Sequence, residues 1–104
     1  MDVGVRMLKA MGASDYEAST CMDFLVKANL RGHDSHGVIR LVPYIKRIQR
    51  GGTNLRSEIR IVREGPSTAL IDGNWGLGQV VAKRGMEIAI EKAQKTGAGT
   101  VSIF

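Results

Sequence analysis

The spacing of apolar residues predicts three helices in the first half of the chain. The first ends at Gly12, after a helical pattern that runs from Val3 to Met11. Ser14 to Glu17 forms an S-x-x-E capping box, which opens a helix from Asp15 to about Arg31. One apolar face of this helix is expected to carry Ala18, Cys21, Met22, Leu25 and Ala28.

A third helical pattern runs from about Gly37 to Arg50, where Pro43 either kinks the helix or starts it anew. Beyond it, alternating apolar residues on either side of Gly65-Pro66 indicate two strands joined by a turn. The residues that carry this alternation are Ile59, Ile61, Ala69 and Ile71.

A glycine-rich loop over residues 73–78 then leads into a helix from about Gln79 to Thr96, closed by Gly97. Its predicted buried stripe consists of Ala82, Met86, Ala89, Ile90 and Ala93. A last strand runs from Thr100 to Phe104. The order of N-terminal helices, β-hairpin, helix and strand predicts a mixed α+β fold.

Composition is that of an ordinary globular domain, with 43% apolar and 24% charged residues among 104. The net charge of +5 favours anionic partners, including a carboxylate substrate. The basic residues alternate with apolar ones and few aromatic residues accompany them, so we expect no nucleic-acid partner.

Cysteine content and hydropathy indicate a reducing, aqueous compartment. Cys21 is the single cysteine, which excludes an intramolecular disulfide, and its place in an apolar pattern predicts a buried thiol. No apolar run approaches the length of a membrane span, and the N-terminal residues lack a signal-peptide pattern. We therefore expect a cytoplasmic protein without a membrane partner.

The densest polar cluster is the run RGHDSHG at residues 31–37, followed by Arg40. In a helix that begins near Ser35, His36 and Arg40 share one face, with Tyr44 one turn further on. An imidazole can transfer a proton near neutral pH, and a guanidinium can bind a carboxylate through two parallel hydrogen bonds. A capped helix start with a hydrogen-bonded surface histidine would explain the same residues.

A metal site and a phosphate-binding loop are two further hypotheses, and both have weaker support. His33, Asp34 and His36 do not form a standard ligand set and the chain has no further histidine, so we expect no metal site. The loop at residues 73–78 could form a phosphate cradle, but Val81 stands where a dinucleotide-binding fingerprint needs a small residue. A tight turn, with glycines at positive φ and Trp75 as a packing residue, is preferred.

Four runs in matching order and spacing resemble the N-terminal part of the malate/L-lactate dehydrogenase family: RGHDSHGVIR, YIKRIQRGG, ALIDGNWGLGQVVA and AIEKAQKTGAGTV. This family includes ureidoglycolate, sulfolactate and diketogulonate-reducing enzymes, and it is distinct from the Rossmann-type lactate dehydrogenases. The resemblance implies that residues 1–104 are the N-terminal portion of a larger non-Rossmann dehydrogenase fold, which would make the chain truncated.

The resemblance also implies roles for individual residues. His36 would be the catalytic proton donor or acceptor at the substrate oxygen, and Arg40 would bind the substrate carboxylate. Ser35 and Tyr44 would be further substrate-binding residues. A second histidine of the family, beyond Phe104, is an alternative acid–base group, and most contacts to NAD or NADP also lie later, so the cofactor-binding residues are unknown. A homodimer is implied.

The sequence therefore predicts an oxidoreductase that transfers hydride between NAD(P) and a 2-hydroxy or 2-keto acid such as malate or lactate. The 104 residues alone are expected to be inactive. The alternative is a small basic interaction module, which would bind an anionic partner without catalysis through Arg40, Lys46, Arg47 and Arg50.

Overall fold

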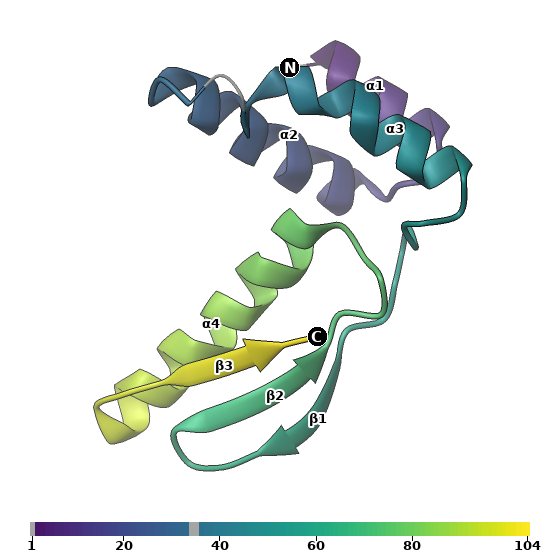
Figure 1. The fold of residues 1–104 in the computed structure, drawn as a ribbon. Helices are drawn as coiled ribbons and strands as arrows, with labels where there is room; N and C mark the ends of the chain where they lie inside the picture. Colours follow the sequence, from purple (N-terminus) through teal and green to yellow (C-terminus); the bar gives the residue numbers. More distant parts are fainter. Residues whose placement is uncertain (1, 34–35) are drawn as a thin grey trace. The chain divides into compact units, whose positions relative to one another are not determined.

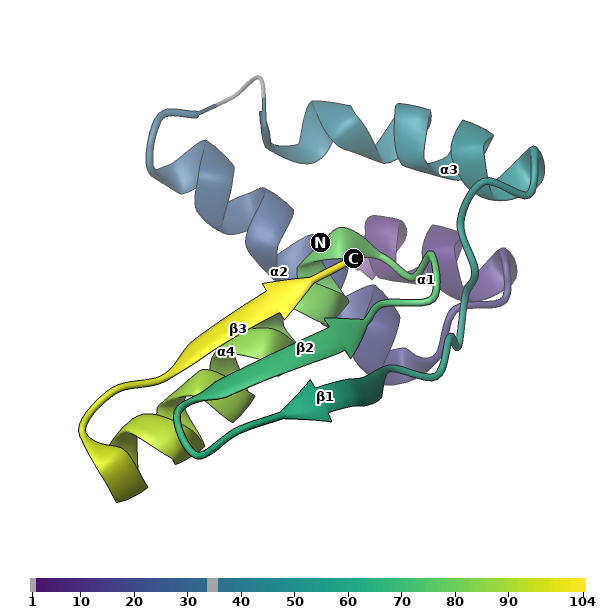
Figure 2. The same ribbon diagram turned by 60° about the horizontal axis from the view of Figure 1, so that its bottom comes forward.

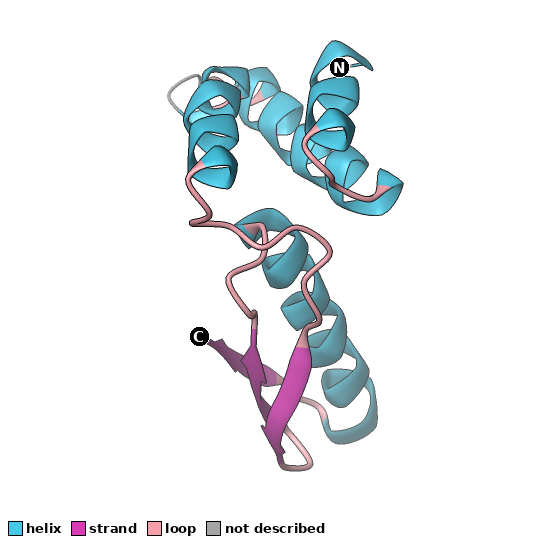
Figure 3. Ribbon diagram, turned by 90° about the vertical axis from the view of Figure 1, so that its right-hand side faces the viewer, coloured by secondary structure: helices cyan, strands magenta, loops and turns pink. Residues whose placement is uncertain are grey.

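The computed structural model describes residues 2–33 and 36–104, which form two compact units. Unit 1 covers Met1–Arg56 and unit 2 covers Ser57–Phe104. The described part of unit 1 is built from helices, and the strands of the described chain all lie in unit 2 (Figures 1 and 3). The predicted mixed α/β class is confirmed.

Unit 1 is built on the packing of α1 (Asp2–Ala10) against α2 (Asp15–Leu30). The helices approach closely at Gly4, where an added Cβ would lie 2.6 Å from the sulfur of Met22. The predicted apolar face of α2 is confirmed, because most of its residues are buried. The buried apolar residues of the two helices are Leu8, Ala18, Cys21, Met22 and Leu25.

The start of α2 is held by the predicted capping box and by a contact that joins it to the end of unit 1. The Ser14 hydroxyl accepts a hydrogen bond from the Glu17 backbone N–H, and the Glu17 carboxylate accepts one from the Ser14 N–H, both at 3.1 Å. The buried Glu17 carboxylate also accepts the Arg56 backbone N–H at 2.8 Å from each oxygen. We call this contact between the Glu17 carboxylate and the Ser14 and Arg56 N–H groups the Glu17 clasp. It holds Arg56 at a φ of 57°, a left-handed backbone that is rare for arginine.

The third predicted helix is interrupted. A 3₁₀ turn, η2 (Val38–Arg40), precedes α3 (Leu41–Gln49), so the chain does not form one helix from Gly37 to Arg50. Pro43 lies in the first turn of α3, where its missing N–H deprives the helix of no hydrogen bond. Of the two expected effects of Pro43, a fresh helix start therefore describes the structure better than a kink.

Unit 2 is a three-stranded sheet with one helix on one face (Figure 2). β1 (Arg60–Glu64) pairs antiparallel with β2 (Thr68–Asp72), which pairs in parallel with β3 (Thr100–Ile103). The connection from β2 to β3 contains α4 (Gly78–Thr96), which ends at Gly97 with a φ of 92°. This β2–α4–β3 arrangement brings the carboxyl ends of two parallel strands together.

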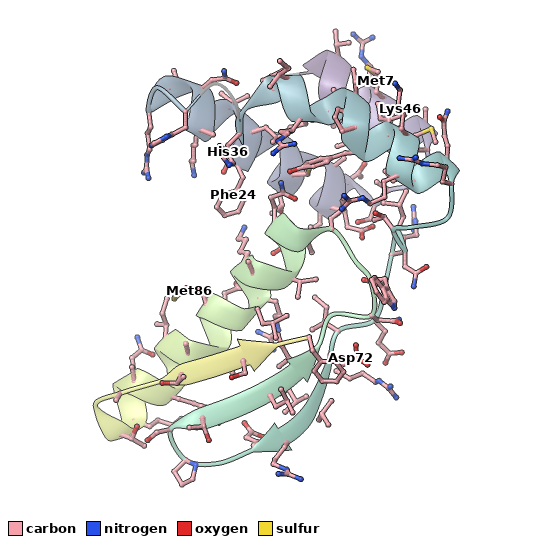
Figure 4. All side chains as sticks on the ribbon, in the orientation of Figure 1. Met7, Phe24, His36, Lys46, Asp72 and Met86 are labelled. Carbon is pink, nitrogen blue, oxygen red and sulfur yellow. The ribbon has the colours of Figure 1, made fainter. Side chains whose placement is uncertain are left out.

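The core of unit 2 lies between the sheet and α4. Its buried residues are Ala69, Ile71, Val81 and Ile88, with Ile59 and Val101 packed against them. The predicted stripe of α4 is wrong at three of its five positions. Met86 is 61% exposed, and Ala82 and Ile90 are exposed as well, whereas Ala89 and Ala93 are partly buried. The buried residues of α4 are Val80, Val81, Gly85, Ile88 and Lys92. Figure 4 shows Met86 pointing away from the sheet.

β1 also differs from its predicted alternation, because all five of its residues are exposed. The strand lies at one edge of the sheet and its register shifts between Ile61 and Arg63, which disrupts the alternation of faces. It is tied to α4 by Lys92, whose ammonium donates to Glu64 at 2.7 Å and to the Gly65 carbonyl at 2.9 Å.

Candidate functional site

The polar cluster identified in the sequence lies where α2 gives way to η2. His36 is exposed and its backbone N–H donates to the His33 carbonyl at 2.9 Å. Arg40 is exposed at the end of η2 (Figure 4 labels His36 at this junction). Ser35, predicted to bind substrate, lies outside the described residues. The structure therefore presents an imidazole and a guanidinium on one short surface segment.

His36 and Arg40 are not one turn apart on a continuous helix, as the spacing had predicted. Gly37 between them has φ −97° and ψ −146°, which lies outside the helical region. Arg40 and Tyr44 do keep the predicted relation, because Arg40 has helical backbone angles directly before α3 and Tyr44 follows four residues later. Tyr44 is partly buried.

Asn29 on α2 holds the start of η2, and sequence reasoning missed it. Its side-chain oxygen accepts the backbone N–H of Val38 at 2.7 Å. A Cβ at Gly37 would overlap the Asn29 side chain, so glycine is required there by close packing. The only signal in the sequence was a polar residue at the end of an apolar helix, followed by the glycine of the His-Gly pair. Asn29 and Gly37 together set the path of the backbone from His36 to Arg40.

The charged residues that directly follow the polar cluster are all basic. Residues 36–57 contain no aspartate or glutamate, and their charged side chains are all basic. Five side chains contribute, on Arg40, Lys46, Arg47, Arg50 and Arg56. The local potential therefore favours an anionic ligand, and Arg40 can hold a carboxylate in two-point contact.

Cys21 is not part of a reactive site. The thiol is buried inside unit 1, which confirms the prediction from its apolar surroundings. Burial raises the pKa of the Cys21 thiol to about 11, because desolvation disfavours the thiolate. It is therefore protonated at neutral pH and is a poor nucleophile.

A second candidate region lies in unit 2, where the glycine-rich loop joins β2 to α4. A cavity of about 440 Å³ opens there, between the loop, the first turns of α4 and the end of β3. The preferred explanation of the loop is corrected: its glycines do not have positive φ, and the left-handed residues are Asn74 (φ 51°) and Trp75 (φ 59°). Trp75 is 79% exposed, so it is not the packing residue that was expected.

The described residues contain neither a candidate metal-binding cluster nor a candidate membrane-spanning helix. No group of three or more histidine, cysteine, aspartate or glutamate side chains among residues 2–33 and 36–104 could hold a metal ion. No helix within residues 2–33 and 36–104 is both long enough and apolar enough to cross a bilayer.

Solved structures with this arrangement of helices and sheet define the class of protein. The chain superposes on malate dehydrogenase from Pyrococcus horikoshii with a TM-score of 0.94 and 52% identity, covering 96% of this chain and 29% of that one. Sulfolactate dehydrogenase from Methanocaldococcus jannaschii gives a TM-score of 0.96 with 42% identity, covering 98% and 30%. The fold is thus that of the N-terminal part of these dehydrogenases.

Sequence comparison identifies the family. The family model for malate/L-lactate dehydrogenase matches residues 2–104, and the chain belongs to this family, as the sequence motifs had indicated. The ureidoglycolate dehydrogenase (NAD(+)) of Escherichia coli strain K12 is 42% identical over 92 residues, which are 88% of this chain and 26% of that protein. The chain spans slightly more than a quarter of the length of the curated relatives that it matches.

Proposed function

We propose that this protein is an oxidoreductase that interconverts a 2-hydroxy acid, such as malate or lactate, and the corresponding 2-keto acid. The proposal is carried by one observation. In a chain that belongs to the malate/L-lactate dehydrogenase family, an exposed imidazole and an exposed guanidinium lie within residues 36–40, at the start of a stretch whose charged side chains are all basic. The named relatives include malate and sulfolactate dehydrogenases, whose substrates are small hydroxy acids.

The proposed roles follow from the chemistry of the two side chains. Arg40 binds the substrate carboxylate, which orients the neighbouring hydroxyl-bearing carbon. In the oxidising direction His36 accepts the hydroxyl proton while the C–H bond breaks and the carbonyl forms. In the reducing direction protonated His36 returns that proton to the developing alkoxide, where the charge changes most. Tyr44 and Ser35 are proposed to complete the substrate pocket.

NAD or NADP would accept the hydride in the oxidising direction and would donate it in the reducing direction. The hydride carries two electrons and one proton. We further propose that the active form is a cytoplasmic homodimer. Residues 1–104 would be the N-terminal portion of each subunit. The 104 residues alone are then expected to show no dehydrogenase turnover. The family resemblance implies a second histidine beyond Phe104 as an alternative acid–base group, so the experiment must test His36 directly.

The test replaces each of two exposed histidines in the complete protein. His36→Ala should lower kcat about a hundred-fold to ten-thousand-fold, because loss of a general acid–base group has that effect. His33→Ala is the matched control, since this exposed histidine lies three residues earlier, and it should keep near wild-type turnover. Steady-state rates with a responsive 2-keto acid decide the question. Normal turnover in His36→Ala would assign the proton transfer to another residue.

A second candidate function is the basic interaction module, which the exclusively basic charge of residues 36–57 favours. It would bind an anionic polymer through Arg40, Lys46, Arg47 and Arg50. Such binding should weaken steeply as salt rises, because each neutralised phosphate releases counterions. Binding of a duplex oligonucleotide at 50 and 200 mM salt tests it. If no salt-sensitive binding is seen at low salt, the module function is wrong.

A further inference from the structure

Gly78 is the one glycine of the described chain whose identity the fold does not explain. Four glycines have a positive φ that other residues adopt at a cost: Gly12, Gly32, Gly51 and Gly97. At eight others an added Cβ would lie 3.0 Å or less from a neighbouring atom: Gly4, Gly37, Gly52, Gly65, Gly73, Gly76, Gly85 and Gly99. Gly78 has no positive φ, and an added Cβ there would meet nothing within 4 Å.

Glycine at this position is unfavourable for the helix that it begins. Gly78 is the first residue of α4, where alanine would lose less backbone entropy on folding. The residue also lines the cavity described above. Gly78 is exposed and an added Cβ would meet open space, so the fold would accept a side chain there, and glycine keeps this part of the cavity lining open.

The cavity has the dimensions and the lining of a small-molecule site. Its volume is about 440 Å³, within the range of about 300–1,000 Å³ that is typical of ligand pockets. Apolar side chains form much of its wall, contributed by Val81, Ala82, Ile103 and Phe104. It lies at the carboxyl ends of the parallel strands β2 and β3, where α/β folds commonly bind ligands.

Trp75 offers this cavity an aromatic surface. It follows Asn74 in the left-handed region, and two consecutive non-glycine residues there are unusual. Such strained conformations concentrate at ligand clamps and active sites. With 79% of its surface exposed, the indole of Trp75 is available beside the cavity for stacking with a planar ring.

The charged lining of the cavity selects the kind of ring. Asp72 is its one charged residue, and no lysine or arginine is among the described residues that line it. One Asp72 oxygen accepts the Asn74 N–H at 2.8 Å, and the other is 3.7 Å from the Arg60 guanidinium. A carboxylate has further lone pairs and no proton to donate, so it favours ligands with N–H donors and disfavours phosphates. Figure 4 shows Asp72 at the loop end of β2.

We propose that this pocket binds a planar heteroaromatic ring that bears N–H donors, with the ring stacked on Trp75 and a donor hydrogen-bonded to Asp72. Nicotinamide and adenine both have this chemistry. The pocket is supported only by residues of unit 2. The assignment of its ring to a dinucleotide cofactor rests on the proposed function. Neither His36 nor Arg40 enters the argument, so the two proposals can fail separately.

Trp75 is the only tryptophan among residues 1–104, so the emission of this chain gives a direct test. The purified chain of residues 1–104 is titrated separately with nicotinamide and adenosine, which distinguish the two sources of the ring. Cyclohexanecarboxamide is the non-planar control, and N-acetyltryptophanamide corrects for collisional quenching. We expect a saturable change in Trp75 emission with one or both ring probes. A response that stays linear for both, as with the free indole, would overturn the proposal.

Variants at Gly78 separate a ligand role from a structural one. Gly78→Leu should weaken ring binding about tenfold or more, because its side chain occupies the cavity. Gln94→Leu is the matched control, since it adds the same side chain at an exposed position of α4 outside the lining, and it should bind normally. Gly78→Ala should fold with an equal or higher Tm and still bind less tightly. Unchanged binding by folded Gly78→Leu would show that the ring does not occupy this cavity.

Asp72→Asn provides an independent check of the hydrogen bond. The amide oxygen can still accept the Asn74 N–H, so the loop should keep its shape. We expect weaker binding of both ring probes, because an amide accepts an N–H less strongly than a carboxylate. Wild-type affinity in this variant would remove Asp72 from the site and overturn the proposed recognition of N–H donors.

Discussion

The two units of the chain differ in how they hold their candidate sites. In unit 1 the segment that carries His36 and Arg40 lies on the surface, and the Asn29 side chain accepts a hydrogen bond from the Val38 N–H at the start of η2. In unit 2 the cavity is built on paired strands and a 19-residue helix that share one apolar core. In unit 1 a polar contact therefore positions the segment with the groups suited to proton transfer and carboxylate binding. In unit 2 hydrophobic packing forms the cavity, which is large enough for a ring.

The largest effect is expected from removing part of the unit 2 core. Ile71 on β2 is completely buried against α4, so Ile71→Ala should lower the free energy of unfolding by about 2–5 kcal/mol. Ile61→Ala on the exposed strand β1 is the control and should cost less. Chemical denaturation measures both. Equal losses would show that β1 buries as much apolar surface as β2, contrary to its exposed residues.

A smaller loss is expected from opening the Glu17 clasp of unit 1. Glu17→Ala removes the acceptor of the Ser14 and Arg56 N–H groups and should destabilise the protein by about 2 kcal/mol, as expected for hydrogen bonds to a charged group. The exposed Glu58 is the control residue, and Glu58→Ala should change stability little. If thermal unfolding gives the two variants the same Tm, the Glu17 clasp does not stabilise unit 1.

Arg40→Lys tests whether the exposed guanidinium of unit 1 binds substrate. In the complete protein we expect KM for the acid to rise about tenfold with kcat little changed, because one ammonium cannot make both parallel hydrogen bonds. Arg50→Lys, at another exposed position of the basic segment, should leave KM unchanged. A fall in stability without a change in KM would make Arg40 a structural residue.

The smallest effect concerns the buried thiol of unit 1 at high pH. Because the pKa of Cys21 is raised to about 11 in the folded chain, the folded state favours the neutral thiol. The stabilisation is complete below the ordinary thiol pKa near 9 and is lost as pH rises through about 11. Stability should fall by about 1 kcal/mol by pH 10 relative to Cys21→Ser measured in parallel. Identical pH profiles of the two proteins would contradict this burial effect.

Much of the fold could be predicted because its signals are local. The capping box at Ser14 acts within one helical turn, and the left-handed stop at Gly97 acts within one residue. The order of helices, hairpin, helix and strand follows from such signals together with periodicity. The candidate residues His36 and Arg40 were also identifiable, since the spacing and the family motif both lie within a few positions of the chain.

The sequence by itself therefore determined the elements, their order and the family, because backbone propensities, caps and motifs are properties of short segments. The tertiary structure alone decided which face of α4 is buried, since apolar residues lie on more than one of its faces and only the sheet selects among them. It also paired Asn29 with Val38, and it placed Gly78 and Trp75 beside one cavity. These contacts join residues from different elements, and their energies depend on distances that no local pattern encodes.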